Sequence, residues 1–241
     1  MKKIILLSSL MAIALTGCGK KEDVLVVGTN AAFPPFEYVG GVSGDEIKGF
    51  DIEIAKQIAK DAGKTLKIEN MKFDSLIVAL NSGKIDMIAS GMTITAERLK
   101  SVNFSQPYYE ATQVVITQKQ DDSIQSLSDL EAKHAAVQLG TTGDIMAKKY
   151  TGEVTAFNTG FEAIMELNNS KVDLVLIDSE PAASYLEKNP DLKLVELKFD
   201  AEFYGFAISK KDPELLQQVN ATLAKMKTNG QYDTLISQYM K

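Results

Sequence analysis

The residue types that most enzymes use for nucleophilic or metal chemistry are almost missing from this sequence. His134 is the only histidine and Cys18 the only cysteine among 241 residues. A zinc site built on His and Cys is therefore excluded, a Ser-His-Asp or Cys-His nucleophile is nearly excluded, and no internal disulfide can form. We expect His134 to begin a surface strand and to take no part in chemistry. The chemistry that remains is binding by charged and polar groups, or general acid–base chemistry by carboxylates.

Two charged side chains stand where they could hold a small molecule. Arg98 carries a planar guanidinium, which can bind a carboxylate through two parallel hydrogen bonds. Asp178 follows a buried apolar strand (174–177), where its carboxylate can accept from an ammonium group, a donor-only partner. Each also has an ordinary structural explanation, a surface helix arginine and a turn aspartate that ends a strand.

A third candidate is the segment Thr141-Thr142-Gly143, between a predicted strand (135–139) and a predicted helix (144–150). Free backbone N–H groups and the helix dipole make such a helix start a ready anion site. Thr and Gly are also good helix caps, and the two interpretations are compatible.

The elements that must position these groups alternate between strand and helix. Residues 24–29 form a continuous apolar strand, typical of a sheet buried on both faces. Apolar residues at 52, 55, 58, 59 and 62 recur with the helical period and predict a helix over 50–62. Strands over 66–68 and 85–90, a helix over 74–81, and C-terminal helices over 213–227 and 232–240 complete the prediction. This alternation favours parallel α/β units.

The sequence also contains an internal repeat. Leu80-Asn-Ser-Gly-Lys-Ile-Asp86 and Leu167-Asn-Asn-Ser-Lys-Val-Asp173 lie 87 residues apart, and each precedes an apolar strand. Helix-to-strand turns commonly use Asn, Gly and Ser, but the Leu-Asn, Lys and Asp positions coincide too. We therefore expect two similarly wound α/β lobes. Ligands of open α/β sheets sit beyond the carboxyl ends of strands, so Ser90-Gly91 and Ile177-Asp178 should face each other across a cleft.

Two β-prone segments are suited to connect the lobes. Residues 108–117 would cross from the first lobe to the second, and residues 203–209 would return. Two adjacent crossings form a hinge that lets lobes close on a ligand.

The N-terminus indicates export. Lys2 and Lys3 precede an apolar run over 4–15 and small residues up to Cys18, the layout of a signal peptide. The run is shorter than the roughly 20 residues of a membrane-spanning helix. Leu15-Thr16-Gly17-Cys18 resembles the lipobox of bacterial lipoproteins, which implies lipidation of Cys18 as the mature N-terminus. Cleavage there leaves 224 residues with 24 basic and 32 acidic side chains, a net charge of −8 that disfavours nucleic acid and anionic lipid as partners.

Five segments together resemble the solute-binding protein of a polar, basic amino-acid ABC transporter (family 3, a type II periplasmic binding protein), from about Val24 to the C-terminus. They are Gly28–Tyr38 (GTNAAFPPFEY), Gly49–Asp51 (GFD), Gly91–Arg98 (GMTITAER), Phe104–Tyr109 (FSQPYY) and Gln138–Gly143 (QLGTTG). The resemblance implies a non-enzymatic, cofactor-free, metal-free and monomeric receptor with a two-lobed α/β fold, two β-strand hinge crossings and a ligand in the interlobe cleft. Its partners would be one L-amino acid, the permease, and the membrane through the lipid on Cys18.

The same resemblance implies a division of the chain. The expected parts are a lipoprotein signal peptide (1–17), a lipidated tether (18–23), lobe 1 (24–108 and 206–241), lobe 2 (113–201) and the hinge (109–112 and 202–205).

The resemblance also implies roles for single residues. Arg98 would bind the ligand α-carboxylate, with Thr141 donating to it from lobe 2 next to Thr142. Asp178 would bind the ammonium group, with the Ser90 carbonyl and Thr93 hydroxyl as its other acceptors. The remaining expected ligand-binding residues are Gly91, the aromatic walls Phe33 and Phe73, and the specificity residues Asn30 and Gln138.

Three functions stay open on the sequence. L-arginine or another basic amino acid is the first expectation. Many basic-amino-acid binders carry Asp where this chain has Asn30, and this departure makes glutamine or another neutral polar amino acid the alternative. Glu37 could supply the missing charge. An enzyme of another class, a cyclohexadienyl dehydratase on the same fold, would need a titratable group beside the reacting atom, for which Asp178 and Glu37 are the candidates. A sensor that reports its ligand to a separate partner protein is the third.

Overall fold

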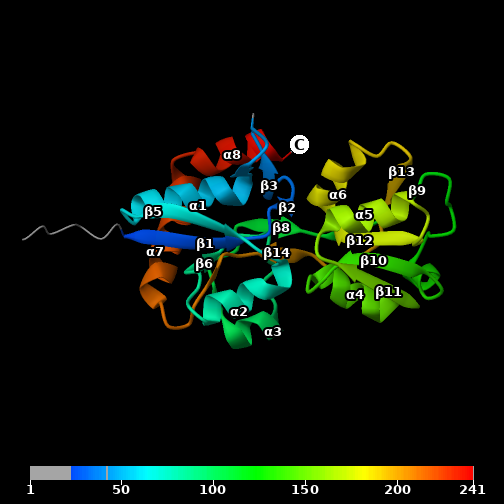
Figure 1. Ribbon diagram of the computed structural model, residues 1–241, viewed down its shortest axis with the longest axis horizontal. Helices are drawn as coiled ribbons and strands as arrows, with labels where there is room; N and C mark the ends of the chain where they lie inside the picture. The colour runs from blue at the N-terminus through cyan, green and yellow to red at the C-terminus, as the bar shows by residue number, and fades with distance from the viewer. Residues whose placement is uncertain (1–22, 42, 241) are drawn as a thin grey trace, which may run out of the picture.

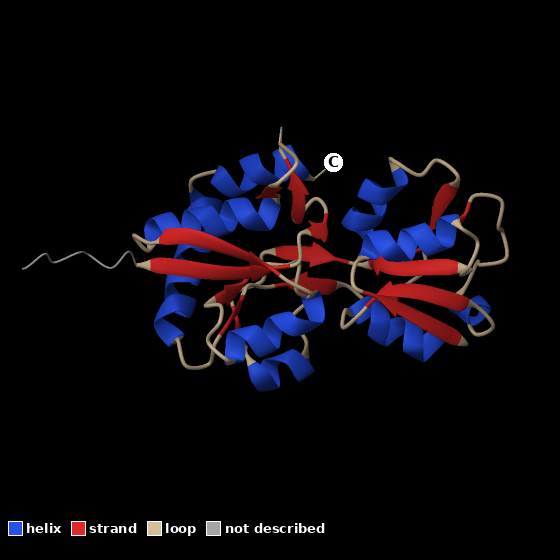
Figure 2. Cartoon of the chain, in the orientation of Figure 1, coloured by secondary structure: helices blue, strands red, loops and turns tan. Residues whose placement is uncertain are grey.

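A computed structural model describes residues 23–41 and 43–240, so the predicted signal peptide and Cys18 lie outside the described residues. The described chain forms two α/β lobes, each built on a five-stranded sheet with helices on both faces (Figures 1 and 2). None of its helices is long and apolar enough to cross a membrane.

Lobe 1 is built on the sheet with strand order β5-β1-β6-β15-β7. The strands are β1 (Val24–Thr29), β5 (Thr65–Asn70), β6 (Met87–Ile88), β7 (Asn103–Phe104) and β15 (Ala207–Ile208), and β2 (Ala32–Phe33), β3 (Glu37–Gly40) and β4 (Glu46–Lys48) form a small extra sheet. The helices are α1 (Phe50–Asp61), α2 (Leu76–Asn81), α3 (Ala96–Ser101), α7 (Pro213–Thr228), α8 (Gln231–Tyr239) and the 3-10 turn η1 (Phe73–Ser75). β1 pairs in parallel with β5 and β6, whereas β15 pairs antiparallel with β6 and β7.

Lobe 2 is built on the sheet with strand order β11-β10-β12-β9-β13. Its strands are β9 (Gln113–Gln118), β10 (His134–Gln138), β11 (Glu153–Phe157), β12 (Leu174–Asp178) and β13 (Leu192–Val195), and its helices are α4 (Thr142–Tyr150), α5 (Gly160–Asn168), α6 (Ser179–Leu186) and the 3-10 turn η2 (Leu127–Leu130). β10 is parallel to β11 and β12, and β9 is antiparallel to β12 and β13.

The chain crosses between the lobes twice, on adjacent strands. β8 (Tyr109–Ala111) pairs antiparallel with β14 (Glu202–Tyr204) between the two sheets (Figure 1). Aromatic rings fill the lobe 1 end of this crossing: the Tyr108 and Phe206 rings stack with centroids 4.4 Å apart, and Phe36 packs edge-on against Tyr109 and Tyr204. Offset and edge-on pairs of this kind add stability beyond the area they bury.

Local sequence explains where the helices begin. Thr95, Thr141 and Thr159 each accept a hydrogen bond at the start of a helix (α3, α4 and α5), satisfying an amide that has no partner within the helix. α1 instead follows Gly49, whose φ is +136° and where a Cβ atom would lie 2.2 Å from the Phe36 carbonyl oxygen. Only glycine fits that position.

The predicted elements are largely confirmed, including both β crossings and the repeated helix–turn–strand unit. Two expectations are wrong. The strand predicted over 85–90 is limited to β6 (Met87–Ile88), and beyond it the chain turns at Gly91, whose φ is +48°. The strand that begins at His134 is not a surface strand, since β10 is paired on both edges.

Candidate ligand-binding site

One cavity between the lobes brings together all eleven residues that the sequence predicts as ligand-binding. Its empty space, counted together with the open solvent at its mouth, is about 290 Å³. Its lining consists of Asn30, Phe33, Phe73, Ser90, Gly91, Thr93, Arg98, Gln138, Thr141, Thr142 and Asp178, together with Glu37. Groups 148 residues apart in sequence thus meet at the carboxyl ends of strands from two sheets, where open α/β folds bind ligands.

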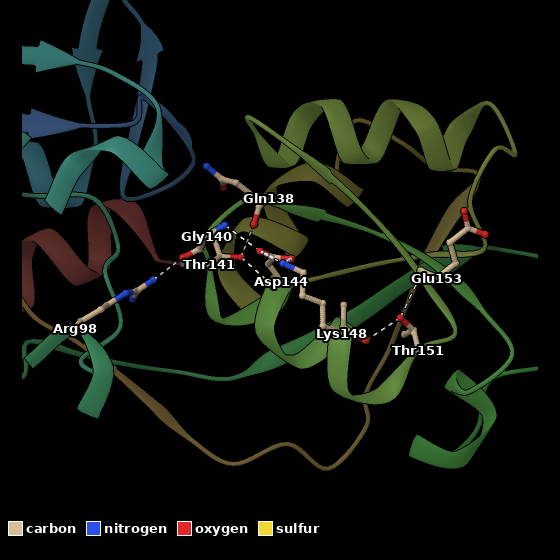
Figure 3. A network of polar contacts seen from close by, with 9 residues as sticks. Arg98, Gln138, Gly140, Thr141, Asp144, Lys148, Thr151 and Glu153 are labelled. Atoms are coloured by element: carbon tan, nitrogen blue, oxygen red, sulfur yellow. Dashed lines mark hydrogen bonds and ion pairs between the residues drawn. The ribbon is translucent and has the colours of Figure 1, made fainter. Parts of the chain in front are cut away.

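Arg98 lies in the first turn of α3 and reaches across the cleft. Its Nη1 donates to the Thr93 carbonyl oxygen at 2.7 Å, and its Nη2 donates to the Gly140 carbonyl oxygen of lobe 2 at 3.0 Å (Figure 3). The guanidinium carbon lies 5.3 Å from the Phe73 ring centre. A guanidinium has five N–H donors, so these two contacts leave donors for a carboxylate. Arg98 is also the only arginine in the sequence.

Phe73 therefore holds Arg98 as well as forming a wall, through a cation–π contact with the guanidinium. Burial lowers the pKa of Arg98, and the carboxylates of Glu202 and Asp178 oppose that shift. Arg98 remains charged in any case, because a guanidinium does not lose its proton in proteins.

Two buried carboxylates face the same cavity. Asp178 is the last residue of β12 and 6% exposed, and its Oδ1 has no hydrogen-bond partner in the part of the chain described. Glu37 is fully buried; its Oε1 accepts from the Ser90 hydroxyl at 3.0 Å, and its Oε2 has no partner within the described ranges. An unpaired buried carboxylate oxygen is costly, so Glu37 Oε2 is a ready acceptor for a cationic ligand. The Tyr204 and Gln113 side chains lie against the Asp178 carboxyl and favour its charged form.

The pKa values of these acids reflect their surroundings. Burial, and to a lesser extent the Glu202 carboxylate, raises the pKa of Asp178 to about 7. Burial raises the pKa of Glu37 well above its usual range, with further contributions from Asp51 and Asp178. Loss of hydration disfavours the charged form of a carboxyl group, and a cationic ligand would reverse that preference.

Asn30 and Gln138 join the lobes directly. Gln138 Nε2 donates to Asn30 Oδ1 at 3.0 Å and also contacts the Asn158 carbonyl oxygen at 3.2 Å. Asn30 Nδ2 donates to the Met71 carbonyl oxygen at 2.9 Å. The main hydrogen-bonding capacity left on Gln138 is its acceptor oxygen, because a primary amide offers one carbonyl oxygen and two N–H donors.

Thr141 caps the start of α4. The Thr141 hydroxyl donates to the Gln138 carbonyl oxygen at 2.8 Å and accepts from the Asp144 amide at 3.2 Å (Figure 3). The bond from Asp144 confirms the cap predicted from the sequence. The Thr141 proton is engaged with Gln138 and is not free for a ligand carboxylate, which differs from the donor role expected of Thr141. The groups of this turn that suit an anion are the first backbone amides of α4, which have no acceptor within the helix.

Gly91 allows the chain to turn at the cavity wall. Its φ is +48°, and a Cβ atom there would lie 2.7 Å from the Phe33 ring. Its amide donates to Asp51 Oδ2 at 2.9 Å, and the same oxygen accepts from the Tyr108 hydroxyl at 2.7 Å. Glycine at this position and the buried Asp51 therefore fix the loop that carries Ser90 and Thr93.

Sequence reasoning left Glu37 without a place in the site and missed the roles of Asp51 and Glu202. Glu37 and Asp51 lie inside the motifs of the family resemblance, so their motif positions were the available signal. Glu202 lies in a crossing segment and carried no signal, because its contacts depend on chain segments 60 to 109 residues away. Within residues 23–41 and 43–240, no group of three or more His, Cys, Asp or Glu side chains is placed to hold a metal ion.

Comparisons with known proteins identify similar chains. The arginine-binding extracellular protein ArtP of Bacillus subtilis (strain 168) is 37% identical over 250 aligned positions, covering 98% of this chain and 96% of that protein. A probable histidine-binding protein of Campylobacter jejuni is 37% identical over 218 positions, covering 89% and 84%. These relatives are named as binding proteins, not as enzymes.

Solved structures give the same picture. An ancestral arginine-binding protein bound to arginine matches with a TM-score of 0.87 and 42% identity, covering 91% of this chain and 99% of that one. The ancestral protein bound to glutamine matches with a TM-score of 0.86. Residues 25–241 match the family model of bacterial extracellular solute-binding proteins, family 3. The fold, the interlobe cavity and these comparisons together show that the chain belongs to that family.

Proposed function

We propose that this protein captures one basic L-amino acid outside the cytoplasm, with L-arginine as the first candidate, and delivers it to an ABC permease. The observation that carries the proposal is the charge pattern of the cavity, where a single guanidinium, Arg98, faces two buried carboxylates, Asp178 and Glu37. An α-carboxylate would pair with Arg98 and an α-ammonium group with Asp178, which leaves Glu37 for a second positive charge.

The acceptor oxygen left on Gln138 suits a basic side chain, and the second N–H of Asn30 Nδ2 suits the oxygen of an amide side chain. Asn30 and Gln138 bond to each other, and what remains on Gln138 is an acceptor oxygen. A guanidinium brings only donors, whereas a glutamine side chain brings donors and an acceptor. Relatives named for arginine and histidine support the same class, and the glutamine-bound ancestral structure keeps glutamine as the alternative to test.

Closure would come from groups that the lobes share. Arg98 to Gly140, Gln138 to Asn30 and the Tyr185 hydroxyl to the Ala32 carbonyl oxygen are hydrogen bonds from one lobe to the other. We infer that the lobes open and close about residues 109–112 and 202–205, between lobe 1 (24–108 and 206–241) and lobe 2 (113–201). A ligand that bonds to both lobes would favour the closed form.

A ligand screen tests the proposal. Purified protein is heated with each L-amino acid, and a ligand at 100 times its dissociation constant should add about 2.7 kcal/mol to the unfolding free energy. We expect the largest shift with L-arginine. Arg98→Ala should abolish the shift for every amino acid, because it leaves the ligand carboxylate without its buried partner.

Glu37→Gln separates basic from neutral ligands. It should weaken arginine and spare glutamine. Glu214→Gln, an exposed carboxylate at the start of α7, is the control of equal charge. A parent protein stabilised by glutamine alone would contradict the basic ligand.

The proposal also covers the N-terminus, which we expect to be lipidated, and the assembly state, which we expect to be a monomer. We infer that Cys18 carries a lipid that anchors a monomeric receptor to the membrane. Cys18→Ser should release the protein from the membrane fraction, and light scattering of the released protein should give the mass of one chain.

A further inference from the structure

Glu202 is a buried carboxylate that lies beneath the cavity without lining it. It begins β14, one of the two crossing strands, and is 8% exposed. Its Oε2 accepts from the Thr142 hydroxyl at 2.7 Å, from the Thr93 hydroxyl at 3.0 Å and from Gln113 Nε2 at 3.3 Å. This one oxygen atom thus accepts three hydrogen bonds.

These donors come from both sides of the cleft. Thr93 belongs to lobe 1 and pairs with Tyr204 of β14 in an isolated bridge. Thr142 is the first residue of α4, and Gln113 the first residue of β9, both in lobe 2. Glu202 therefore joins the two lobes at the point where the chain crosses.

The direction of these hydrogen bonds limits what the threonines can offer a ligand. A hydroxyl has one proton and two acceptor lone pairs. Thr93 and Thr142 both line the cavity, and each hydroxyl donates its single proton to Glu202 Oε2. Thr142 also accepts from Gln113 Nε2 at 3.2 Å, so it keeps one lone pair, whereas Thr93 keeps two. Toward the cavity, both hydroxyls are acceptors only.

We propose that Glu202 is a positioning residue that fixes the Thr93 and Thr142 hydroxyls as acceptors, and so makes the cavity select ligands with a charged α-amino group. An ammonium group donates and never accepts, so it matches this arrangement, whereas a ligand without that group would leave the acceptors unpaired. The inference rests on the proposed function, because it assumes that an amino acid occupies the cavity.

Glu202 sets the direction of the two threonine hydrogen bonds and also acts on Arg98. Together with Asp178 it supports the charged form of Arg98 against burial. The binding of an ammonium group would thus depend on one carboxylate facing the cavity and a second that acts through two hydroxyls.

The test compares two probes that differ only in the α-amino group, L-arginine and 5-guanidinopentanoate, by titration calorimetry. Glu202→Gln should weaken L-arginine about tenfold or more, since hydrogen bonds to charged groups are lost, and weaken 5-guanidinopentanoate by less than about threefold. Glu110→Gln is the matched control, because Glu110 is an exposed carboxylate on β8, the other crossing strand. It should change neither affinity.

Thr93→Val provides a second route that does not depend on the folding of the Glu202 variant. It should reproduce the selective loss of L-arginine affinity, and the double variant should lose less than the sum of the two, since both act through one hydrogen bond. Equal weakening of both probes by Glu202→Gln, or no weakening, would overturn the inference. A parent protein that binds no amino acid would overturn the proposed function instead.

Discussion

The same helix–turn–strand unit occurs twice, at residues 80–90 in lobe 1 and at residues 167–178 in lobe 2. The two copies differ in the residues at the end of the strand. In each, a helix ends, the chain turns through a left-handed residue, and an aspartate joins the first parallel strand of the lobe. Asp86 exchanges two hydrogen bonds with Val26, both 2.8 Å long. Asp173 exchanges two with His134, at 2.8 and 2.9 Å.

The two units differ in the residues that come after the aspartate. In lobe 1 the strand is only β6, and the chain then turns at Gly91 to present the neutral Ser90. In lobe 2 the strand runs for five residues and ends directly in Asp178. The repeated part thus builds the scaffold, and the part that is not repeated would carry the binding chemistry that we propose.

The largest expected effect comes from removing the charge at the end of the lobe 2 strand, at Asp178. Asp178→Asn should weaken amino-acid binding by about 2–5 kcal/mol, because the ligand ammonium loses its charged partner. Ser90→Ala, at the equivalent strand end, should cost only about 1 kcal/mol, because the Ser90 carbonyl stays in place and the lost hydroxyl bonds to Glu37 and the Asn30 amide. Titration calorimetry measures both. An Asp178→Asn protein that binds within twofold of the parent would remove the distinction between the two ends.

The pH dependence of stability should show the buried acids of both lobes, Glu37 and Asp51 in lobe 1 and Asp178 in lobe 2. Burial raises the pKa of Asp51 in lobe 1 and of Asp178 in lobe 2 to about 7. The folded protein then holds these protons more tightly than the unfolded chain, so their contribution is complete below the usual carboxyl pKa and is lost as the pH rises toward 7. Each can change the unfolding free energy by up to about 1.4 kcal/mol per pH unit in that window.

Urea unfolding of the ligand-free protein between pH 5 and pH 8 measures this loss. Asp51→Asn and Asp178→Asn should each flatten the profile relative to the parent. Profiles that keep the parent's slope in both variants would show that neither acid binds its proton more tightly when folded.

The repeated aspartates should matter for stability and not for binding. Asp86→Ala and Asp173→Ala should each lower the unfolding free energy by about 1–3 kcal/mol, because a strand amide loses a charged acceptor. The effect should be larger at Asp86, which is less exposed than Asp173. Urea unfolding measures the loss, and calorimetry should find the ligand affinity unchanged. Weakened binding without a loss of stability would contradict the scaffold role.

The smallest effect concerns the left-handed turn residue. It is Gly83 in lobe 1, with φ +75°, and Ser170 in lobe 2, with φ +56°. Gly83→Ser should lower the unfolding free energy by about 1 kcal/mol, the cost of a side chain in this conformation. Ser170→Gly should raise it by less, because glycine also gains freedom in the unfolded chain. Urea unfolding of both variants measures the two changes, and a gain at Gly83 would show that the two turns are not equivalent.

The sequence predicted most of the fold because strand and helix periodicity and turn residues are local signals. It predicted the site through motifs, and all eleven residues lie around one cavity. It could not predict that Arg98 bonds to the Gly140 carbonyl oxygen, because Gly140 approaches Arg98 only when the lobes meet. Nor could it predict that Glu202 collects hydrogen bonds from both lobes, since no local pattern marks a buried acid whose donors are so distant in sequence.

The position of β15 has a consequence for the order in which the chain can fold. β15 lies inside the lobe 1 sheet, between β6 and β7, although it comes almost at the end of the chain. The lobe 2 sheet is complete once residue 195 has emerged, whereas the lobe 1 sheet lacks an inner strand until residue 208. A chain that emerges from its N-terminus would therefore hold an incomplete lobe 1 open while lobe 2 forms, and cross-lobe contacts would be made last.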